Sequence, residues 1–342
     1  MVVHTKSESD TRYFLEQLGV NWYLNYNFDM SQAPATANKV LFIQVPTDAT
    51  VWTSGQAESI GSHTHPPTDD EVRSLGFSDP AKIRSTAMSN PGSYWYIFGE
   101  ANRWAYMTGD RFAPVFKYFH SQLKLADPTA KIIGTSLLNW DWTCLGCGGY
   151  QSGQAWYEDF VSAYERLPPL FETPPVDVWA IDAYPIDWVR TPNSALHAQI
   201  VIDQLTGMRQ RLDSDGYVGT PIWVTEIAIH VGYDGWDWDP SSTKLVPRLP
   251  YHPDKMSDYM NVVLDWLDAN WVEQKIEKWF FFITWKDIVN VGPDGYMGLT
   301  FFNGGGHGES LNCLGEVYRA RSLGNSPLAC DFAGDTVPAD GP

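Results

Sequence analysis

The sequence predicts a single (β/α)8 barrel, and three observations support this prediction. Seven short runs rich in aromatic and β-branched residues are typical of parallel strands that are buried on both faces. Amphipathic segments long enough for crossover helices separate most of these runs. Several runs end in polar or aromatic residues, as expected where an active site forms at the carboxyl ends of barrel strands. With 342 residues, the chain is long enough for one such barrel.

The predicted strands span residues 20–26, 39–45, 94–98, 131–135, 178–183, 222–225 and 279–284. The predicted helices span residues 111–126, 153–166, 196–213 and 254–270. A barrel needs eight strands, and counting back from the last run makes 94–98 the fourth. The third strand is then expected within residues 46–91, and the competing architecture is an open doubly wound sheet. No G-x-G-x-x-G fingerprint follows the first strand to favour that alternative.

We expect the barrel to occupy residues 1–325 and residues 326–342, rich in Pro, Gly and Asp, to be a flexible tail or linker. A net charge of −18 makes nucleic acid an unsuitable partner, because the protein would repel phosphate groups. The sequence contains no run of about 18 apolar residues, so it does not predict a membrane-spanning segment. The 16 Trp suit the flat faces of sugars, although a large barrel also buries many aromatic side chains.

The chain contains four cysteines, Cys144, Cys147, Cys313 and Cys330. Two disulfides, free thiols and a metal site are the alternatives. The C-L-G-C pair resembles half of a zinc site, but the other two cysteines lack C-x-x-C spacing. Disulfides would imply an oxidising compartment, so we expect a secreted protein whose leader was removed before this numbering begins. We expect no metal and no other cofactor.

Two glutamates follow predicted strands directly. Y-W-Y-I-F-G-E ends in Glu100 and P-I-W-V-T-E ends in Glu226. Glycosidic bond cleavage needs one carboxyl that holds a proton and one that is ionised, and the mouth of a barrel can supply both environments. The alternative reading is that each glutamate is a buried partner of an Arg or Lys. Two glutamates at matching ends of opposed strands favour catalysis.

Six short segments carry a resemblance to glycoside hydrolase clan A, a group of retaining barrel enzymes. F-G-E-A-N at 98–102 resembles the strand-4 motif that carries the acid/base, and V-T-E at 224–226 resembles the strand-7 end that carries the nucleophile. The other four are D-P-T-A-K-I (127–132), D-V-W-A-I-D-A-Y-P (177–185), F-F-F-I-T-W (280–285) and G-Y-M-G-L-T-F-F-N-G-G-G (295–306). The resemblance covers roughly residues 20–325. It implies that Glu100 is the acid/base, Glu226 the nucleophile, Tyr184 a contact of the nucleophile and Trp285 a sugar platform.

The sequence departs from the clan pattern near both glutamates. The usual Asn before the acid/base is Gly99, the usual Pro after it is Ala101, and Asp182 stands where a His is common. The missing Asn normally binds the sugar 2-hydroxyl, a contact that strengthens in the transition state. Substitutes for it are expected among Asn25, Asn102 and Asn139, and the further expected substrate contacts are Asp182, Trp22, Trp140 and Trp236.

The resemblance implies a retaining hydrolase of β-linked glycans. Abundant Trp in the loops favours an endo-acting cleft for a polysaccharide such as a β-glucan, xylan or mannan, and an exo-acting pocket is the alternative. We expect a monomer whose partner is an oligo- or polysaccharide. A barrel that binds glycans without cleaving them is the second reading, and Gly99 is its main support. A structural or partner-binding protein is the third, and it would require an exposed apolar patch.

Overall fold

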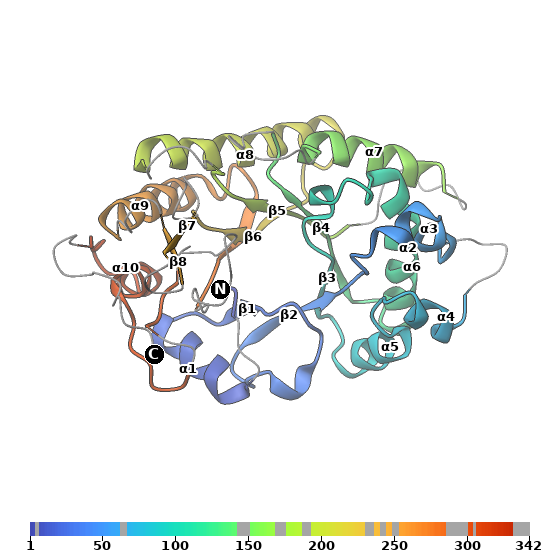
Figure 1. The fold of residues 1–342 in the computed structure, drawn as a ribbon, viewed down its shortest axis with the longest axis horizontal. Helices are drawn as coiled ribbons and strands as arrows, with labels where there is room; N and C mark the ends of the chain where they lie inside the picture. The colour runs from blue at the N-terminus through green and yellow to red at the C-terminus, as the bar shows by residue number, and fades with distance from the viewer. Residues whose placement is uncertain are drawn as a thin grey trace.

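Seven parallel strands and the helices between them form the barrel in Figure 1. The computed structural model describes residues 1–3, 7–61, 67–141, 151–167, 176–186, 193–229, 236–239, 244–247, 253–284, 300–303 and 306–330. The strands, in their order within the sheet, are β1 (Trp22–Leu24), β2 (Asn38–Ile43), β3 (Tyr94–Ile97), β4 (Lys131–Leu138), β5 (Val178–Ala183), β6 (Ile222–Ile227) and β9 (Ile276–Phe281). The predicted (β/α)8 class is therefore confirmed.

The amino-terminal residues 1–3 lie between β9 and β1 and close the barrel there. Val2 forms a parallel bridge with Leu24, and the Val3 amide donates to the Leu24 carbonyl at 2.8 Å. On the other side, the Val2 amide donates to the carbonyl of Phe281 at 3.0 Å, and the Thr284 amide donates to Val2 at 3.1 Å. This tripeptide takes the place of the first barrel strand, so β3 keeps the fourth place and β6 the seventh.

The expectation of a third strand within residues 46–91 is wrong for the residues that the structure describes there. β2 pairs directly with β3, with Leu41 opposite Trp95. The intervening chain instead forms α2 (Ala49–Thr53), α3 (Gln56–Ser59), α4 (Asp69–Ser74) and α5 (Pro80–Ser89). Local capping explains two of these helices: Thr68 and Glu71 form a capping box before α4, and Asp79 caps α5, which begins with a proline. The missed strand was the first one.

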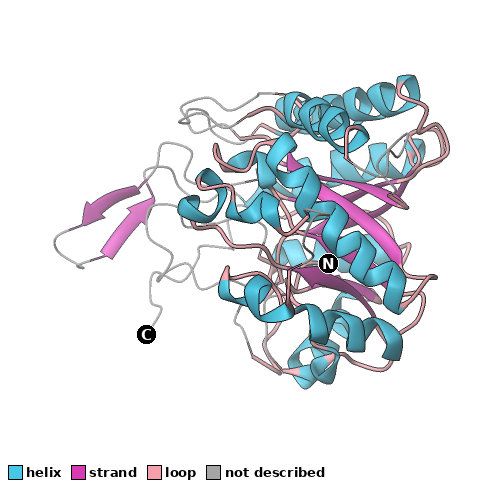
Figure 2. Ribbon diagram, turned by 90° about the vertical axis from the view of Figure 1, so that its right-hand side faces the viewer, coloured by secondary structure: helices cyan, strands magenta, loops and turns pink. Residues whose placement is uncertain are grey.

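Long helices cover the outside of the barrel in Figure 1. Four of them match the predicted helices with ends shifted by at most two residues: α6 (Gly109–Ala126), α7 (Gly153–Glu165), α8 (Ser194–Ser214) and α9 (Pro253–Asn270). The others are α1 (Glu8–Leu18) and α10 (Cys313–Ser322), with the short 3-10 helices η1 (Met30–Gln32) and η2 (Ala101–Arg103). A ribbon of β7 (Trp236–Asp239) and β8 (Lys244–Pro247) projects from the barrel in Figure 2.

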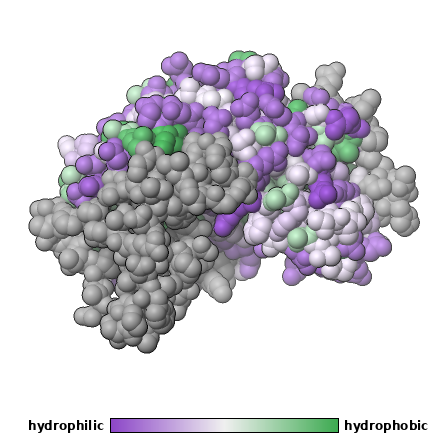
Figure 3. All heavy atoms as spheres, turned by 45° about the horizontal axis from the view of Figure 1, so that its top comes forward, coloured by the Kyte–Doolittle hydropathy of each residue, from purple (hydrophilic) through white to green (hydrophobic). Residues whose placement is uncertain are grey.

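Aromatic packing accounts for many of the tryptophans. Six of them are at most 2% exposed: Trp52, Trp95, Trp140, Trp156, Trp179 and Trp223. The described residues in Figure 3 present a mainly hydrophilic surface with apolar residues scattered over it. No helix within the described ranges has both the length and the apolar character that crossing a membrane would require.

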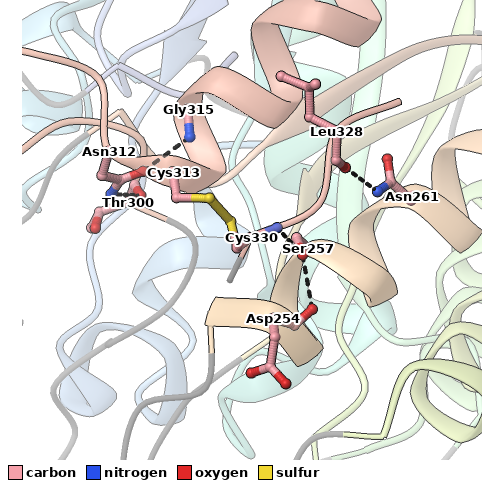
Figure 4. The surroundings of a disulfide bond; sticks show 9 residues. All are labelled: Asp254, Ser257, Asn261, Thr300, Asn312, Cys313, Gly315, Leu328 and Cys330. Atoms are coloured by element: carbon pink, nitrogen blue, oxygen red, sulfur yellow. Dashed lines mark hydrogen bonds between the residues drawn. A yellow bond between two sulfur atoms is a disulfide. The ribbon is translucent and has the colours of Figure 1, made fainter. Parts of the chain in front are cut away.

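A disulfide joins Cys313, at the start of α10, to Cys330 (Figure 4). The segment that carries Cys330 runs along α9, where the Cys330 amide donates to the Ser257 hydroxyl at 3.1 Å. Asn261 also donates to the carbonyl of Leu328 at 2.8 Å. The first five residues of the expected tail are thus attached to the barrel. Cys144 and Cys147 lie outside the described residues, as do residues 331–342.

Replacing both Cys313 and Cys330 with Ser should lower the free energy of unfolding by about 3 kcal/mol, because the bond closes a loop of about 17 residues. Urea unfolding with and without a reducing agent measures this difference. The Asn261→Ala variant, which loses only a hydrogen bond to the same segment, is the control and should lose about 1 kcal/mol. Equal stability of the double Ser variant and the wild type would contradict the assignment.

Candidate active site

Glu100 and Glu226 meet at the carboxyl ends of the barrel strands. Glu100 follows β3 and opens η2, and its amide donates to the carbonyl of Ser136 on β4 at 3.0 Å. Glu226 lies on β6. One carboxylate oxygen each from Glu100, Asp182 and Glu226 lie within 4.8 Å of one another. The fold therefore gathers three acids, from the fourth, sixth and seventh places of the barrel, over one point.

The backbone around this point is held in uncommon conformations. Tyr26, Phe98, Glu100 and Asn139 all have positive φ, between 52° and 59°, and each stands just beyond the end of a strand. Non-glycine residues rarely adopt this left-handed region, which costs roughly 1 kcal/mol or more per residue. Such strain persists where surrounding structure holds it, and it clusters at functional sites.

Two tyrosines bind Glu226. The hydroxyl of Tyr26, after β1, donates to Oε1, and the hydroxyl of Tyr184, after β5, donates to Oε2. Burial and the charge of Glu226 keep the pKa of both phenols well above the usual value, so they retain their protons and act as donors. Both oxygens of Glu226 therefore accept a hydrogen bond, the arrangement that favours an ionised carboxylate.

The pKa values of the two glutamates are raised. Burial and the nearby Glu100 raise the pKa of Glu226 to about 8, against the opposing effect of the two tyrosine hydroxyls. Burial also raises the pKa of Glu100, although Arg103 partly offsets it through an ion pair at 3.2 Å. Arg103 is half-exposed, so solvent weakens that pair. Two carboxyls this close share one proton at neutral pH, and the titration belongs to the pair.

The three acids could in principle bind a divalent cation, because oxygen ligands suit Mg²⁺ and Ca²⁺. Their oxygens, however, already contact donors. Glu226 is bound by two tyrosines, Glu100 by Arg103, and Asp182 by the hydroxyls of Ser136 and Thr225. A cation would have to compete with all of these groups. The donor set fits a hydrogen-bonded acid cluster better than a metal centre.

The structure explains why Gly99 replaces the usual Asn. A Cβ atom at Gly99 would lie 2.7 Å from the hydroxyl oxygen of Tyr96 and 3.4 Å from the hydroxyl of Ser136. Tyr96 rises inside the barrel from β3 and donates to Ser136, so its hydroxyl occupies the space that a side chain at residue 99 would need. Tyr96 is 1% exposed and cannot turn aside. The loss of the Asn is thus coupled to the presence of this tyrosine.

The three candidate asparagines have different environments. The Asn102 amide group donates to the carbonyls of Leu138 and Gln151 and accepts from the Leu138 amide, so it fastens loops together. The Asn139 Oδ1 accepts from the Tyr184 amide at 2.8 Å, which sets the backbone that carries a Glu226 partner. Asn139 Nδ2 and Asn25 Oδ1 are buried and have no hydrogen-bond partner among the described residues.

Two expected sugar contacts, Trp140 and Trp22, are packed against other side chains of the barrel. Trp140 is 2% exposed and packs against Tyr157 of α7 and Gly207 of α8, in the layer between strands and helices. Trp22 opens β1, so it lies at the amino end of the barrel, opposite to Glu226. Its ring meets Trp223 edge-on, and the Lys278 ammonium lies 4.1 Å from its centre. The sequence pattern misplaced it because the predicted strand began two residues early.

The side chains of two further candidates, Trp285 and Trp236, are not described by the structure. Trp285 lies outside the described residues. Trp236 opens β7, where it pairs with Pro247, and only its backbone is described.

Sequence reasoning missed four residues of the site: Tyr26, Arg103, Tyr96 and Ser136. A signal existed for Tyr26, which ends the first predicted strand, whereas Ser136 is one small residue within an apolar strand.

Two close carboxyls with raised pKa values, set at the mouth of a (β/α)8 barrel, define the site of a barrel glycosidase. Residues 1–318 match the family model described as the glycosyl hydrolase catalytic core, and the chain belongs to that family. The family confirms the predicted glycoside hydrolase identity. No curated protein matches the chain.

Solved structures with the same fold include several β-1,3-glucanases. A GH128 (subgroup II) endo-β-1,3-glucanase from Sorangium cellulosum is 16% identical, with 93% of this chain and 95% of that one aligned and a TM-score of 0.52. A subgroup I endo-β-1,3-glucanase variant from Amycolatopsis mediterranei, in complex with laminaripentaose, is 17% identical over 93% and 97%, with a TM-score of 0.53. A curdlan-specific exo-β-1,3-glucanase from Blastomyces gilchristii is 12% identical over 93% and 97%, with a TM-score of 0.51.

The Gly99→Ala substitution should destabilise the protein and reduce its activity, because the new methyl group meets the Tyr96 hydroxyl. In the Tyr96→Phe background, the same substitution should cost less, since the obstructing oxygen is gone. A double-mutant cycle on melting temperature and kcat/KM measures this coupling, which we expect to be about 1 kcal/mol or more. Purely additive effects of the two substitutions would contradict the steric explanation.

Proposed function

We propose that the protein is a retaining β-glucan hydrolase in which Glu226 is the nucleophile and Glu100 the acid/base. One observation carries the proposal: oxygens of the two carboxyls lie within 4.8 Å of each other. Retaining enzymes need carboxyls about 5–5.5 Å apart, whereas inverting enzymes need about 6.5–9.5 Å to admit a water molecule between them. The short separation favours direct attack by a carboxylate.

The hydrogen bonds favour Glu226 as the attacking residue. Tyr26 and Tyr184 donate to both oxygens of Glu226, which stabilises its ionised form. The proton of the pair then resides on Glu100. In the first step, Glu226 attacks the anomeric carbon and Glu100 protonates the departing oxygen. In the second step, Glu100 removes a proton from water, which attacks the anomeric carbon and releases Glu226.

The substrate proposal rests on chemistry that the fold neighbours share. Two of the neighbours are named endo- and one exo-acting, and all three are β-1,3-glucanases. We therefore propose a β-1,3-glucan as the substrate, ahead of xylan or mannan. Endo action is our preferred mode, because two of these three neighbours are named endo-acting. Asn25 and Asn139 are the proposed partners of sugar hydroxyls.

The Cys313–Cys330 disulfide supports an oxidising, extracellular setting, and we propose secretion with action as a monomer. The competing proposal is a barrel that binds glycans without cleaving them. Gly99 was its main support, and the position of Tyr96 supplies another reason for that glycine. A mechanism-based fluoroglycoside separates the two proposals, because only a working nucleophile becomes covalently labelled at Glu226.

Replacing Glu226 or Glu100 with Ala should lower kcat on a β-1,3-glucan such as laminarin by about 10³-fold or more, since each residue performs a separate chemical task. Azide should restore activity to the Glu226→Ala variant by attacking the anomeric carbon in place of the carboxylate. NMR of the first-formed product anomer reports the stereochemistry in the wild type. An inverted anomer would overturn the retaining scheme, and full activity of either variant would overturn its assigned role.

The activity should fall as the pH rises through about 8. The raised pKa of Glu226 means that the pair keeps its last proton up to that pH, and the reaction needs that proton on Glu100. Above it, kcat/KM should fall about tenfold per pH unit, as for loss of one proton. The Glu100→Gln variant, tested on an aryl glucoside whose leaving group needs no proton, should lose this alkaline limb. An unchanged limb in that variant would show that another group titrates.

A further inference from the structure

Asp182 is a buried acid that the proposed mechanism does not use. It lies on β5 and is 1% exposed. Within the described ranges, its carboxyl makes no ion pair, and the hydrogen bonds assigned to it come from two hydroxyls. An ionised carboxylate without a cation is costly to bury, because two hydroxyls replace only part of the water it loses.

The Ser136 hydroxyl is the hydrogen-bond partner of one oxygen of Asp182. The Tyr96 hydroxyl donates to Ser136 Oγ, and the Glu100 amide approaches it at 3.3 Å. The Glu100 amide lies closer to the Ser136 carbonyl oxygen, at 3.0 Å, so Tyr96 is the principal donor to this hydroxyl. Ser136 therefore directs its own hydrogen to Asp182 Oδ2, at 2.7 Å. Asp182 Oδ2 is an acceptor.

The Thr225 hydroxyl contacts the other oxygen of Asp182, and its single hydrogen has two possible acceptors. Thr225 Oγ1 lies 2.6 Å from Asp182 Oδ1 and 3.3 Å from the Ile181 carbonyl oxygen. A hydroxyl has only one hydrogen, and a carbonyl can only accept. An ionised Asp182 would accept the Thr225 hydrogen at Oδ1 and leave the longer contact to Ile181 unfilled. A proton on Asp182 Oδ1, donated to Thr225, would fill both contacts.

The groups around Asp182 reinforce this assignment. Glu226 on β6 and Glu100 after β3 each place a carboxylate oxygen within 4.8 Å of it. Tyr96, Tyr26 and Tyr184 also face it, and all three are neutral phenols. The only cation at this cluster among the described residues, Arg103, pairs with Glu100. A second negative charge at Asp182 would repel Glu226 when that residue must be ionised.

We propose that Asp182 stays protonated throughout catalysis and acts as a neutral positioning residue beneath the two glutamates. The inference rests on the proposed function, in which Glu226 must ionise. Asp182 contacts Ser136, which the backbone amide of Glu100 approaches. It also contacts Thr225, which is the residue before Glu226. It thereby connects both catalytic strand ends without adding charge.

Infrared spectroscopy tests the protonation state without any need for activity. Wild-type protein carrying [4-¹³C]aspartate should show, at pH 7, an isotope-shifted carbonyl stretch of a neutral carboxylic acid. The Asp182→Asn variant should lack that band, and Asp177→Asn should keep it, because Asp177 forms an ion pair with Lys131. No neutral aspartic acid band in the wild type would overturn the proposal, whether or not the protein hydrolyses glucan.

The pH profile supplies the second readout. Asn reproduces a neutral carboxyl group, so Asp182→Asn should keep kcat within about threefold of the wild type and leave the alkaline limb in place. If Asp182 were ionised, its removal would move that limb to lower pH by about one unit or more, and such a shift overturns the proposal. Asp182→Ala, which cannot bridge Ser136 and Thr225, should lower kcat more than it changes KM, and rescue of kcat by Asn completes the test.

Discussion

The close approach of like acids in a site withdrawn from water is the constraint on which this active site depends. Glu100, Asp182 and Glu226 lie within 4.8 Å of one another. Full ionisation of such a cluster is prohibitive, so protons must be shared and the surrounding donors decide where they reside. Two tyrosine hydroxyls donate to Glu226, and two hydroxyl groups contact Asp182. The acids therefore lie in different hydrogen-bonding environments, although their side chains are chemically similar.

The barrel supplies the geometry for this arrangement. Parallel strands direct their carboxyl ends to one mouth, and the tight, positive-φ backbone at Tyr26, Glu100 and Asn139 turns each chain sharply over that mouth. The cost of these conformations is balanced by bonds such as that from the Glu100 amide to Ser136. Gly99 belongs to the same design, because the hydroxyl of Tyr96 rises into the space beside it. Departures from a family motif therefore need to be read together with the residues beneath them.

Much of the fold was predictable because burial leaves a periodic pattern. The helices α6 to α9 and most strands lie where their apolar residues placed them. The first strand escaped notice because three residues give no pattern, and residues 46–91 were misjudged because short capped helices resemble loops. Trp22 and Trp140 also show what a local pattern leaves open. Their types suggested sugar binding, but the strand end and the helix layer in which they lie depend on the register of β1 and on packing against α7.

The sequence by itself determined the class of fold and the glycoside hydrolase family, and it singled out the two glutamates as candidates, because apolar periodicity and strand-end motifs are local properties of the chain. Only the tertiary structure decided which groups surround those glutamates. Tyr26 reaches Glu226 across 200 positions of sequence, and Ser136 reaches Asp182 across 46. Contacts of this kind set the pKa values and the proton positions, and they depend on barrel closure, which no local pattern encodes.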